Sequence, residues 1–281
     1  MDESSESVAR ILTRTSGYLL GIASHSLQPY RGCAYGASLC GVGCYVRHNG
    51  LLTRGRGWGS FLVARTNAAG AYLAAFERER AWARSKSGSF SIFMSSATDP
   101  FPPQEQRLRI TSQLLAAMLD RPPDTLIVQT HSPIVLDHVE PLRALSRLTH
   151  LRVQISIESD RDRLPGLPPP AASVAARLAA AAALREAGLM VVVTCAPLFP
   201  IADPDAFFSR VAACADAVVL DHFIEGDGSP EGARTRRTAL PEAIAAIDRE
   251  ALALDYRDRM ATIARRHLPG RVGLGRDGFA G

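Results

Sequence analysis

Hydrophobic and polar residues follow one another along most of this chain in a pattern typical of strands alternating with helices. Short runs rich in β-branched residues predict buried strands, and amphipathic segments between them predict helices. We predict strands at 17–25, 90–96, 125–130, 151–157, 189–196 and 216–223. We predict helices at 103–119, 133–148, 171–188, 203–215 and about 240–267. Continuous apolar strands that alternate with helices indicate a parallel sheet covered by helices.

Six β/α units predict an α/β fold of a particular kind, a partial (β/α)6 TIM-like barrel. The barrel is expected to stay open, because about eight such units are needed for closure. We expect a single domain over residues 1–281, with a core at about 17–223 and a C-terminal helical extension at 224–281. Residues 46–89 give no readable pattern, and the glycine-rich stretch at 54–60 is expected to be a flexible excursion. In such folds the chemistry gathers at the C-terminal ends of the strands.

Composition excludes several classes of protein. The 281 residues are 47% hydrophobic, which is enough for a sizeable core. No uninterrupted apolar run approaches the roughly 20 residues of a membrane helix. The polar, acidic start of the chain does not resemble a signal peptide. We therefore expect a soluble, cytoplasmic protein whose thiols stay reduced.

The formal net charge is +4, and arginine supplies nearly all of the positive charge, since Lys86 is the only lysine. DNA-binding faces cluster their basic residues, whereas these arginines are spread over the whole chain. The GxxxxGK[ST] phosphate loop is absent. A Schiff-base mechanism would have to use Lys86, which lies in a polar segment.

Three of the five cysteines, Cys33, Cys40 and Cys44, occur within twelve positions. In a reducing compartment, clustered cysteines indicate metal binding or catalysis rather than disulfides. With His48 they make a Cys3His set suited to zinc. Alone, they could hold an iron–sulfur cluster with one iron left free for a small ligand. Spacing favours neither interpretation, and a loop of free thiols is the third.

The residues around these cysteines resemble the opening motif of the radical S-adenosylmethionine (SAM) enzymes, in the spore photoproduct lyase-like or DNA repair photolyase-like group. The segment LQPYRGC…CGVGCYVR is similar to that group's NPYRGCxxxCxxCYAR. Further segments resemble family motifs in the family's order, namely SSATDPFPPQEQRLRIT, LIVQTHSPIVLDHVEPLRAL, VQISIESDRDRL and LREAGLMVVVTCAPLFP. The spacing C-x6-C-x3-C is longer than the family's CxxxCxxC, and His131 stands where the family usually has lysine.

The resemblance implies the radical SAM fold and a [4Fe–4S] cluster on Cys33, Cys40 and Cys44. SAM would chelate the fourth iron. An electron from an external donor of the flavodoxin or ferredoxin type would cleave SAM to methionine and a 5′-deoxyadenosyl radical, which abstracts hydrogen from a substrate. A DNA lesion is one candidate substrate, although no aromatic-plus-arginine platform for bases is evident. A zinc-binding barrel and a degenerate, non-catalytic family member are the alternatives.

Under this interpretation, residues near the cluster and at strand ends would contact SAM. Tyr45 would lie beside the cluster and against the adenine. The other expected SAM contacts are Ser96, Thr98, Asp99, Ser156 and Glu158. Asp99 could instead form a turn with Pro100, and Ser156 could be a barrel-lining hydroxyl.

Cys195 is a candidate catalytic residue because it ends a predicted strand at the same rim. There it would return a hydrogen atom to a product radical. A buried cysteine that serves as a small hydrophobic residue is the alternative.

Overall fold

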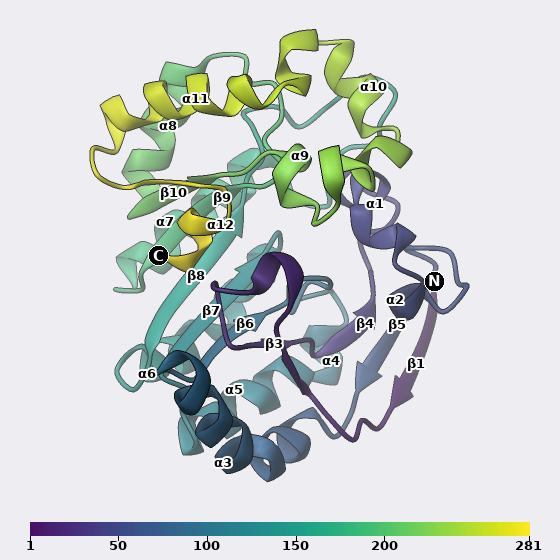
Figure 1. The fold of residues 1–281 in the computed structure, drawn as a ribbon, viewed down its shortest axis with the longest axis vertical. Helices are drawn as coiled ribbons and strands as arrows, with labels where there is room; N and C mark the ends of the chain where they lie inside the picture. The colour runs from purple at the N-terminus through teal and green to yellow at the C-terminus, as the bar shows by residue number, and fades with distance from the viewer.

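The computed structural model describes residues 1–281 and contains one large and one small sheet (Figure 1). The eight strands of the large sheet are ordered β11-β10-β9-β8-β7-β6-β3-β2. Their bounds are β2 Leu12–Arg14, β3 His25–Leu27, β6 Ser91–Met94, β7 Thr125–Thr130, β8 His150–Ser156, β9 Val191–Cys195, β10 Ala217–Leu220 and β11 Val272–Leu274. All neighbours run parallel except β2 and β3, which are antiparallel.

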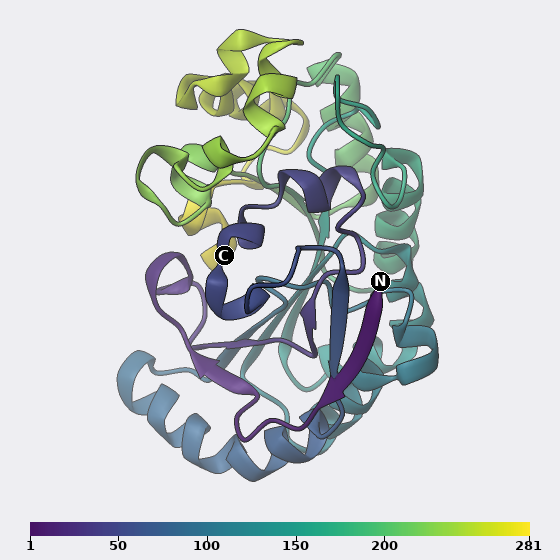
Figure 2. The ribbon, with the colours of Figure 1, turned by 90° about the vertical axis from the view of Figure 1, so that its right-hand side faces the viewer.

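The prediction of an open α/β fold is confirmed, because the edge strands β2 and β11 do not pair with each other. Helices form a continuous layer outside the curved sheet (Figure 2). They include α3 Ala68–Ser87, α5 Ile110–Asp120, α6 Val139–Ser146, α7 Val174–Glu186, α8 Pro204–Cys214 and α11 Leu254–His267. None of the helices is both long and apolar enough to cross a membrane.

Alternate residues of the strands belong to two different cores. The outward residues, such as Val191 and Val193 of β9, belong to a cluster of 58 buried residues that packs against the helices. The inward residues Phe93, Ile127 and Val192 belong to a second cluster inside the partial barrel. Because side chains alternate across a strand, this division decides which strand-end residues can reach a site within the barrel.

Several predicted elements are wrong in position or continuity. The strand predicted at 17–25 is instead a 3-10 turn, η1 Gly17–Leu19, followed by a loop, and β3 begins only at His25. The backbone φ angles of Gly17 and Gly21 are +60° and +92°, which interrupts an extended chain. Three predicted helices are each divided. The predicted helix at 103–119 consists of α4 Glu105–Leu108 and α5, and that at 133–148 consists of η3 Pro133–His138 and α6. The predicted helix at 240–267 consists of α10 Leu240–Ala245, η6 Arg249–Leu252 and α11.

Residues 46–89, which gave no readable pattern, contain regular structure. They include η2 Tyr45–His48, α2 Gly50–Thr53, β5 Phe61–Arg65 and the 20-residue helix α3. Strand β5 forms the small sheet with β1 Asp2–Glu6 and β4 Tyr30–Gly32. The stretch at 54–60 is a compact turn in which Trp58 is buried.

The C-terminal stretch contributes a strand as well as helices. It contains α9 Phe223–Gly226, η4 Pro230–Gly232, η5 Thr235–Arg237, α10, η6, α11, β11 and α12 Gly275–Ala280. Strand β11 pairs with β10. Phe279 of α12 packs against Phe93 on the inner face of the sheet, with ring centroids 6.3 Å apart.

Candidate functional site

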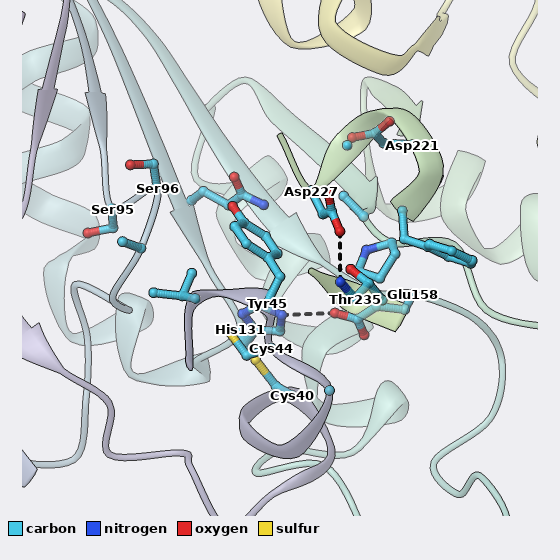
Figure 3. A pocket seen from close by; sticks show the side chains of 18 of the residues that line it. Cys40, Cys44, Tyr45, Ser95, Ser96, His131, Glu158, Asp221, Asp227 and Thr235 are labelled. Atoms are coloured by element: carbon cyan, nitrogen blue, oxygen red, sulfur yellow. Dashed lines mark hydrogen bonds and ion pairs between the residues drawn. The ribbon is translucent and has the colours of Figure 1, made fainter. Parts of the chain in front are cut away.

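A cavity of about 190 Å³ lies where the parallel strands end. Residues in the segments that follow β6, β7, β8, β9 and β10 line it, including Thr98, His131, Glu158, Pro197 and Asp221. Figure 3 shows side chains from several elements converging there. The lining contains carboxylates but no lysine or arginine. The cavity therefore suits a neutral or cationic ligand better than an anionic one.

All three clustered cysteines line this cavity. Cys33 directly follows β4, Cys40 lies in α1 Leu39–Gly43, and Cys44 follows that helix. The Cys33 sulfur accepts a hydrogen bond from the Tyr35 backbone N–H at 3.3 Å. Tyr45, the next residue along, lines the cavity as well and is half-buried.

Close glycine contacts hold the cysteine loop against the turn at 57–60. A Cβ on Gly36 would lie 1.9 Å from the Gly59 Cα, and a Cβ on Gly41 would lie 2.2 Å from the Gly36 Cα. Neither Gly36 nor Gly41 has a positive φ. These glycines are therefore required because a side chain would prevent the close approach of two backbone segments. They are not required for a positive φ angle.

The three thiols fit an iron–sulfur cluster in kind and in location. They are free cysteines on the wall of one cavity. Burial, and after it the nearby Cys40, raises the pKa of both Cys33 and Cys44, so cluster assembly would have to displace their protons. No three His, Cys, Asp or Glu side chains are gathered closely enough to hold a metal ion as they stand. Cluster binding would therefore require the loop to draw its sulfurs together. His48, the fourth ligand of the zinc alternative, does not line the cavity.

A chain of charged side chains starts beside Cys40. His131 Nε2 lies 2.8 Å from Glu158 Oε1, as Figure 3 shows, and Arg177 donates to Glu158 Oε2 at 2.7 Å. Burial alone would raise the pKa of Glu158, but the charges of Arg177 and His131 lower it well below its usual range. Burial opposes protonation of His131, yet the nearby Cys40 and Glu158 raise its pKa. The sequence singled out Glu158 but not Arg177, which lies in α7.

The segment after β6 places Ser96, Thr98 and Asp99 at the cavity wall. Asp99 accepts hydrogen bonds from the backbone of Phe101 and His131, at 2.9 and 2.8 Å, and from the Thr130 hydroxyl at 2.7 Å. Both of its carboxylate oxygens are thus occupied, and burial raises its pKa. The turn expected at Asp99 is present, and it joins the loops that follow β6 and β7.

Ser95 was not among the predicted SAM contacts. It lines the cavity, has a φ of +75°, and its buried hydroxyl has no hydrogen-bond partner. A strained backbone and an unpaired hydroxyl in a cavity wall are typical of a ligand contact. The run of polar residues from Ser95 to Asp99 was the only signal in the sequence that could have found it.

Ser156 and Cys195 both end strands but point to opposite faces of the sheet. Ser156 faces inward and lies 3.2 Å from the Thr194 hydroxyl, with Gln129 donating to it at 3.1 Å. Of these three residues only Gln129 lines the cavity. Cys195 is fully buried in the outer core with Val191 and Val193. Its side chain packs toward the helices and does not line the cavity, and the hydrogen transfer expected from its position in the sequence stays a prediction.

Tyr18 and Asp221 form a pair that the sequence did not predict, because 203 residues separate them. The Tyr18 hydroxyl donates to Asp221 Oδ2 at 2.7 Å, and both residues line the cavity. Burial raises the pKa of Asp221 to about 6, although Tyr18 and Arg257 act to lower it.

The variant Asp221→Asn is expected to remove a pH dependence of stability. Since the pKa of Asp221 is raised from 3.8 to about 6 in the folded protein, folding is favoured while the carboxyl is protonated, and this stability is lost as the pH rises through 6. Each pKa unit is worth about 1.4 kcal/mol, so the loss is about 3 kcal/mol. Urea unfolding should therefore be measured at about pH 4 and about pH 7. The free energy of unfolding of the asparagine variant, relative to that of the wild type, should be higher at about pH 7 than at about pH 4. A difference that does not change with pH would contradict this assignment.

Comparisons with known proteins agree with the fold. No family model matches the chain, and no curated protein matches it in sequence. A solved variant of spore photoproduct lyase with bound AdoMet and dinucleoside spore photoproduct matches with a TM-score of 0.63 at 12% identity, over 97% of this chain and 81% of that one. A second variant of the same enzyme matches with a TM-score of 0.62 at 13% identity, over the same shares. The chain therefore has the fold of spore photoproduct lyase, as its motifs predicted.

Proposed function

We propose that this chain is a radical SAM enzyme in which Cys33, Cys40 and Cys44 hold a [4Fe–4S] cluster and SAM occupies the adjoining cavity. The observation that carries the proposal is the position of the three thiols, which one loop brings to the wall of a single cavity at the strand ends. A solved structure with the same fold contains bound AdoMet, which supports the choice of ligand.

The charges of the cavity fit SAM, which carries a sulfonium, an ammonium and one carboxylate. Of the carboxylates in the lining, Asp221 and Asp227 are hydrogen-bonded but not paired with an arginine or lysine side chain, so their negative charge favours the positive groups. Of the histidines in the lining, His131 has a raised pKa and His222 a lowered one. His131 is thus the group suited to the SAM carboxylate, and Glu158 fixes the orientation of its ring.

Other residues of the wall would orient the rest of the molecule. Tyr45 presents an aromatic ring to the cavity, which suits stacking on adenine. The unpaired Ser95 hydroxyl is available to a polar group of the ligand. Asp99 would act indirectly, because its bonds hold the loops that carry Thr98 and His131. Bound beside SAM, the cluster would supply the electron that cleaves its sulfonium bond and yields a 5′-deoxyadenosyl radical.

The experiment that tests this proposal is release of 5′-deoxyadenosine. Protein loaded anaerobically with iron and sulfide should convert SAM to 5′-deoxyadenosine and methionine when dithionite is added. An external protein donor of the flavodoxin or ferredoxin type should replace dithionite. Failure of cluster-loaded protein to cleave SAM with either reductant would contradict the enzyme assignment.

For the substrate we propose a nucleic-acid lesion, because three arginines lie close in sequence to residues that line the cavity. Arg47 lies two residues after Tyr45, and Arg234 and Arg236 flank Thr235, which also lines the cavity. These three guanidinium groups bond to backbone carbonyl oxygens rather than to carboxylates. Their charges are thus free for phosphates, and the nucleic acid would place its backbone outside the cavity, whose lining has no lysine or arginine.

The double variant Arg234→Ala/Arg236→Ala is expected to weaken DNA binding and to reduce its salt dependence. Each lost phosphate contact should lower the slope of log K against log salt by about 0.7 to 0.9. Fluorescence anisotropy with a labelled oligonucleotide at several salt concentrations measures both effects. The matched control is Arg147→Ala, an exposed arginine before β8, at the opposite end of the strands. Equal effects from both variants would rule out a specific role for these two arginines beside the cavity.

A further inference from the structure

Helix α2 presents an exposed leucine outside the cavity, close to the cysteine loop. Leu51 is 86% exposed, the largest fraction among the large apolar side chains of the structure, and it does not line the cavity. Its neighbour Leu52 packs against a small hydrophobic cluster that contains Cys33, and Cys44 packs against the same cluster. Figure 1 shows α2 beside the small sheet. The surface at Leu51 therefore lies one residue away from a side chain that contacts the surroundings of two thiols.

The arginines beside this helix outnumber the carboxylate with which they pair. Arg54 directly follows α2, and its side chain is 63% exposed. Arg31 donates to the Leu52 carbonyl oxygen at 3.5 Å. Both arginines and Arg65 lie 3.1 to 3.8 Å from the same carboxylate, that of Glu6. Three guanidinium groups thus share one carboxylate, and α2 lies beside a net positive charge.

The sequence around α2 has the same imbalance. Residues 7–76 contain seven arginines and no aspartate or glutamate. A positive surface favours an acidic partner, and an apolar side chain at its centre is typical of a contact between proteins. The phosphate backbone of a nucleic acid would match the charge, but it has no apolar group for Leu51. Charge and exposure together therefore favour an acidic protein.

We propose that Leu51 and Arg54 form a docking surface for an acidic protein that holds a one-electron carrier. The inference rests on the proposed function, because the cluster needs an electron from outside the chain. One electron would pass from the partner's carrier, which is oxidised, to the cluster, which is reduced, and no atom is transferred. The rate of electron transfer falls steeply with distance, so a partner on α2 would be well placed beside the thiols. Such encounters bury little surface, so a small contact is sufficient.

Binding of a flavodoxin, an acidic protein with such a carrier, tests the docking surface on the protein without a cluster. Calorimetric titration at low salt should show binding by the wild type, and binding about 10-fold or more weaker by Leu51→Asp and by Arg54→Glu. Added salt should weaken the binding of the wild type. The matched control is Leu148→Asp, which changes an exposed leucine before β8, at the opposite end of the strands, and should bind as the wild type does. Thermal unfolding of each variant shows whether it is folded.

A second measurement uses the protein loaded with the cluster. Flavodoxin kept reduced by NADPH and its reductase should drive SAM cleavage about 10-fold more slowly in Leu51→Asp than in the wild type, at flavodoxin concentrations below saturation. Cleavage driven by dithionite should be the same in both, because a small reductant needs no docking surface. If the wild type does not cleave SAM with dithionite, the proposed function fails, and the binding measurement still decides whether the docking surface exists.

Several results would overturn the docking surface. They are no flavodoxin binding by the wild type, equal binding by Leu51→Asp and Leu148→Asp, and equal slowing of the two cleavage reactions by Leu51→Asp. If Leu51→Asp weakens the binding of an oligonucleotide as much as that of flavodoxin, the surface belongs to nucleic acid instead. If the wild type self-associates and Leu51→Asp does not, the surface belongs to a second copy of the chain.

Discussion

Cys40→Ala is expected to yield a protein that binds no iron–sulfur cluster after anaerobic reconstitution and releases no 5′-deoxyadenosine above background. Three thiolates are the whole protein ligand set in the proposed site, and two leave the cluster without adequate anchorage. Iron and sulfide analysis, visible absorption and chromatography of the nucleoside product measure the loss.

A matched control separates loss of a ligand from loss of a thiol. Cys214→Ala removes a buried cysteine of α8 that lies in the outer core and does not line the cavity. This variant should keep both colour and SAM cleavage, with at most reduced stability. If Cys40→Ala also keeps both, the assignment of the ligands is wrong.

Gly36→Ala is expected to destabilise the fold by about 3 kcal/mol and to displace the cysteine loop. Its Cβ would lie 1.9 Å from the Gly59 Cα, and a backbone cannot move aside as the end of a side chain can. Gly59→Ala should destabilise the fold at least as strongly. Its Cβ would lie 2.3 Å from the Gly36 Cα, and its φ of +89° adds backbone strain. Urea unfolding gives the change in stability, and iron content after reconstitution gives the effect on the loop.

The control for these variants is Gly43→Ala, in the same loop. There the nearest atom to the new Cβ is a Leu240 methyl group at 3.4 Å, and φ is not positive. Gly43 ends α1, so alanine should cost little or even stabilise. If Gly36→Ala and Gly43→Ala lose equal amounts of stability and iron content, the Gly36–Gly59 contact does not set the position of the loop.

The elements that could be predicted from the sequence are those that are buried along most of their length. Strand β7 matches its predicted range, because its apolar run lies in the middle of a parallel sheet covered by helices. Helix α3 was missed, since charged residues interrupt its apolar face and leave little periodicity. The 17–25 segment is apolar enough for a strand, but two glycines in left-handed conformations interrupt it.

The site was predictable only where its residues are close in sequence. The cysteine loop and the segment ending at Asp99 could be found, because several polar or thiol groups occur together. The contact of Gly36 with Gly59 and the pairing of Tyr18 with Asp221 join distant segments, so no local pattern indicates them. Cys195 was placed at the correct strand end, but a one-residue difference from Thr194 turns it to the outer face.

Anaerobic reconstitution of the wild-type protein with iron and sulfide, followed by metal analysis and absorption spectroscopy, tests the central claim most directly. The proposed site predicts a brown protein that holds one [4Fe–4S] cluster per chain and loses its colour in air. A colourless protein that instead retains stoichiometric zinc, or no metal at all, would contradict it.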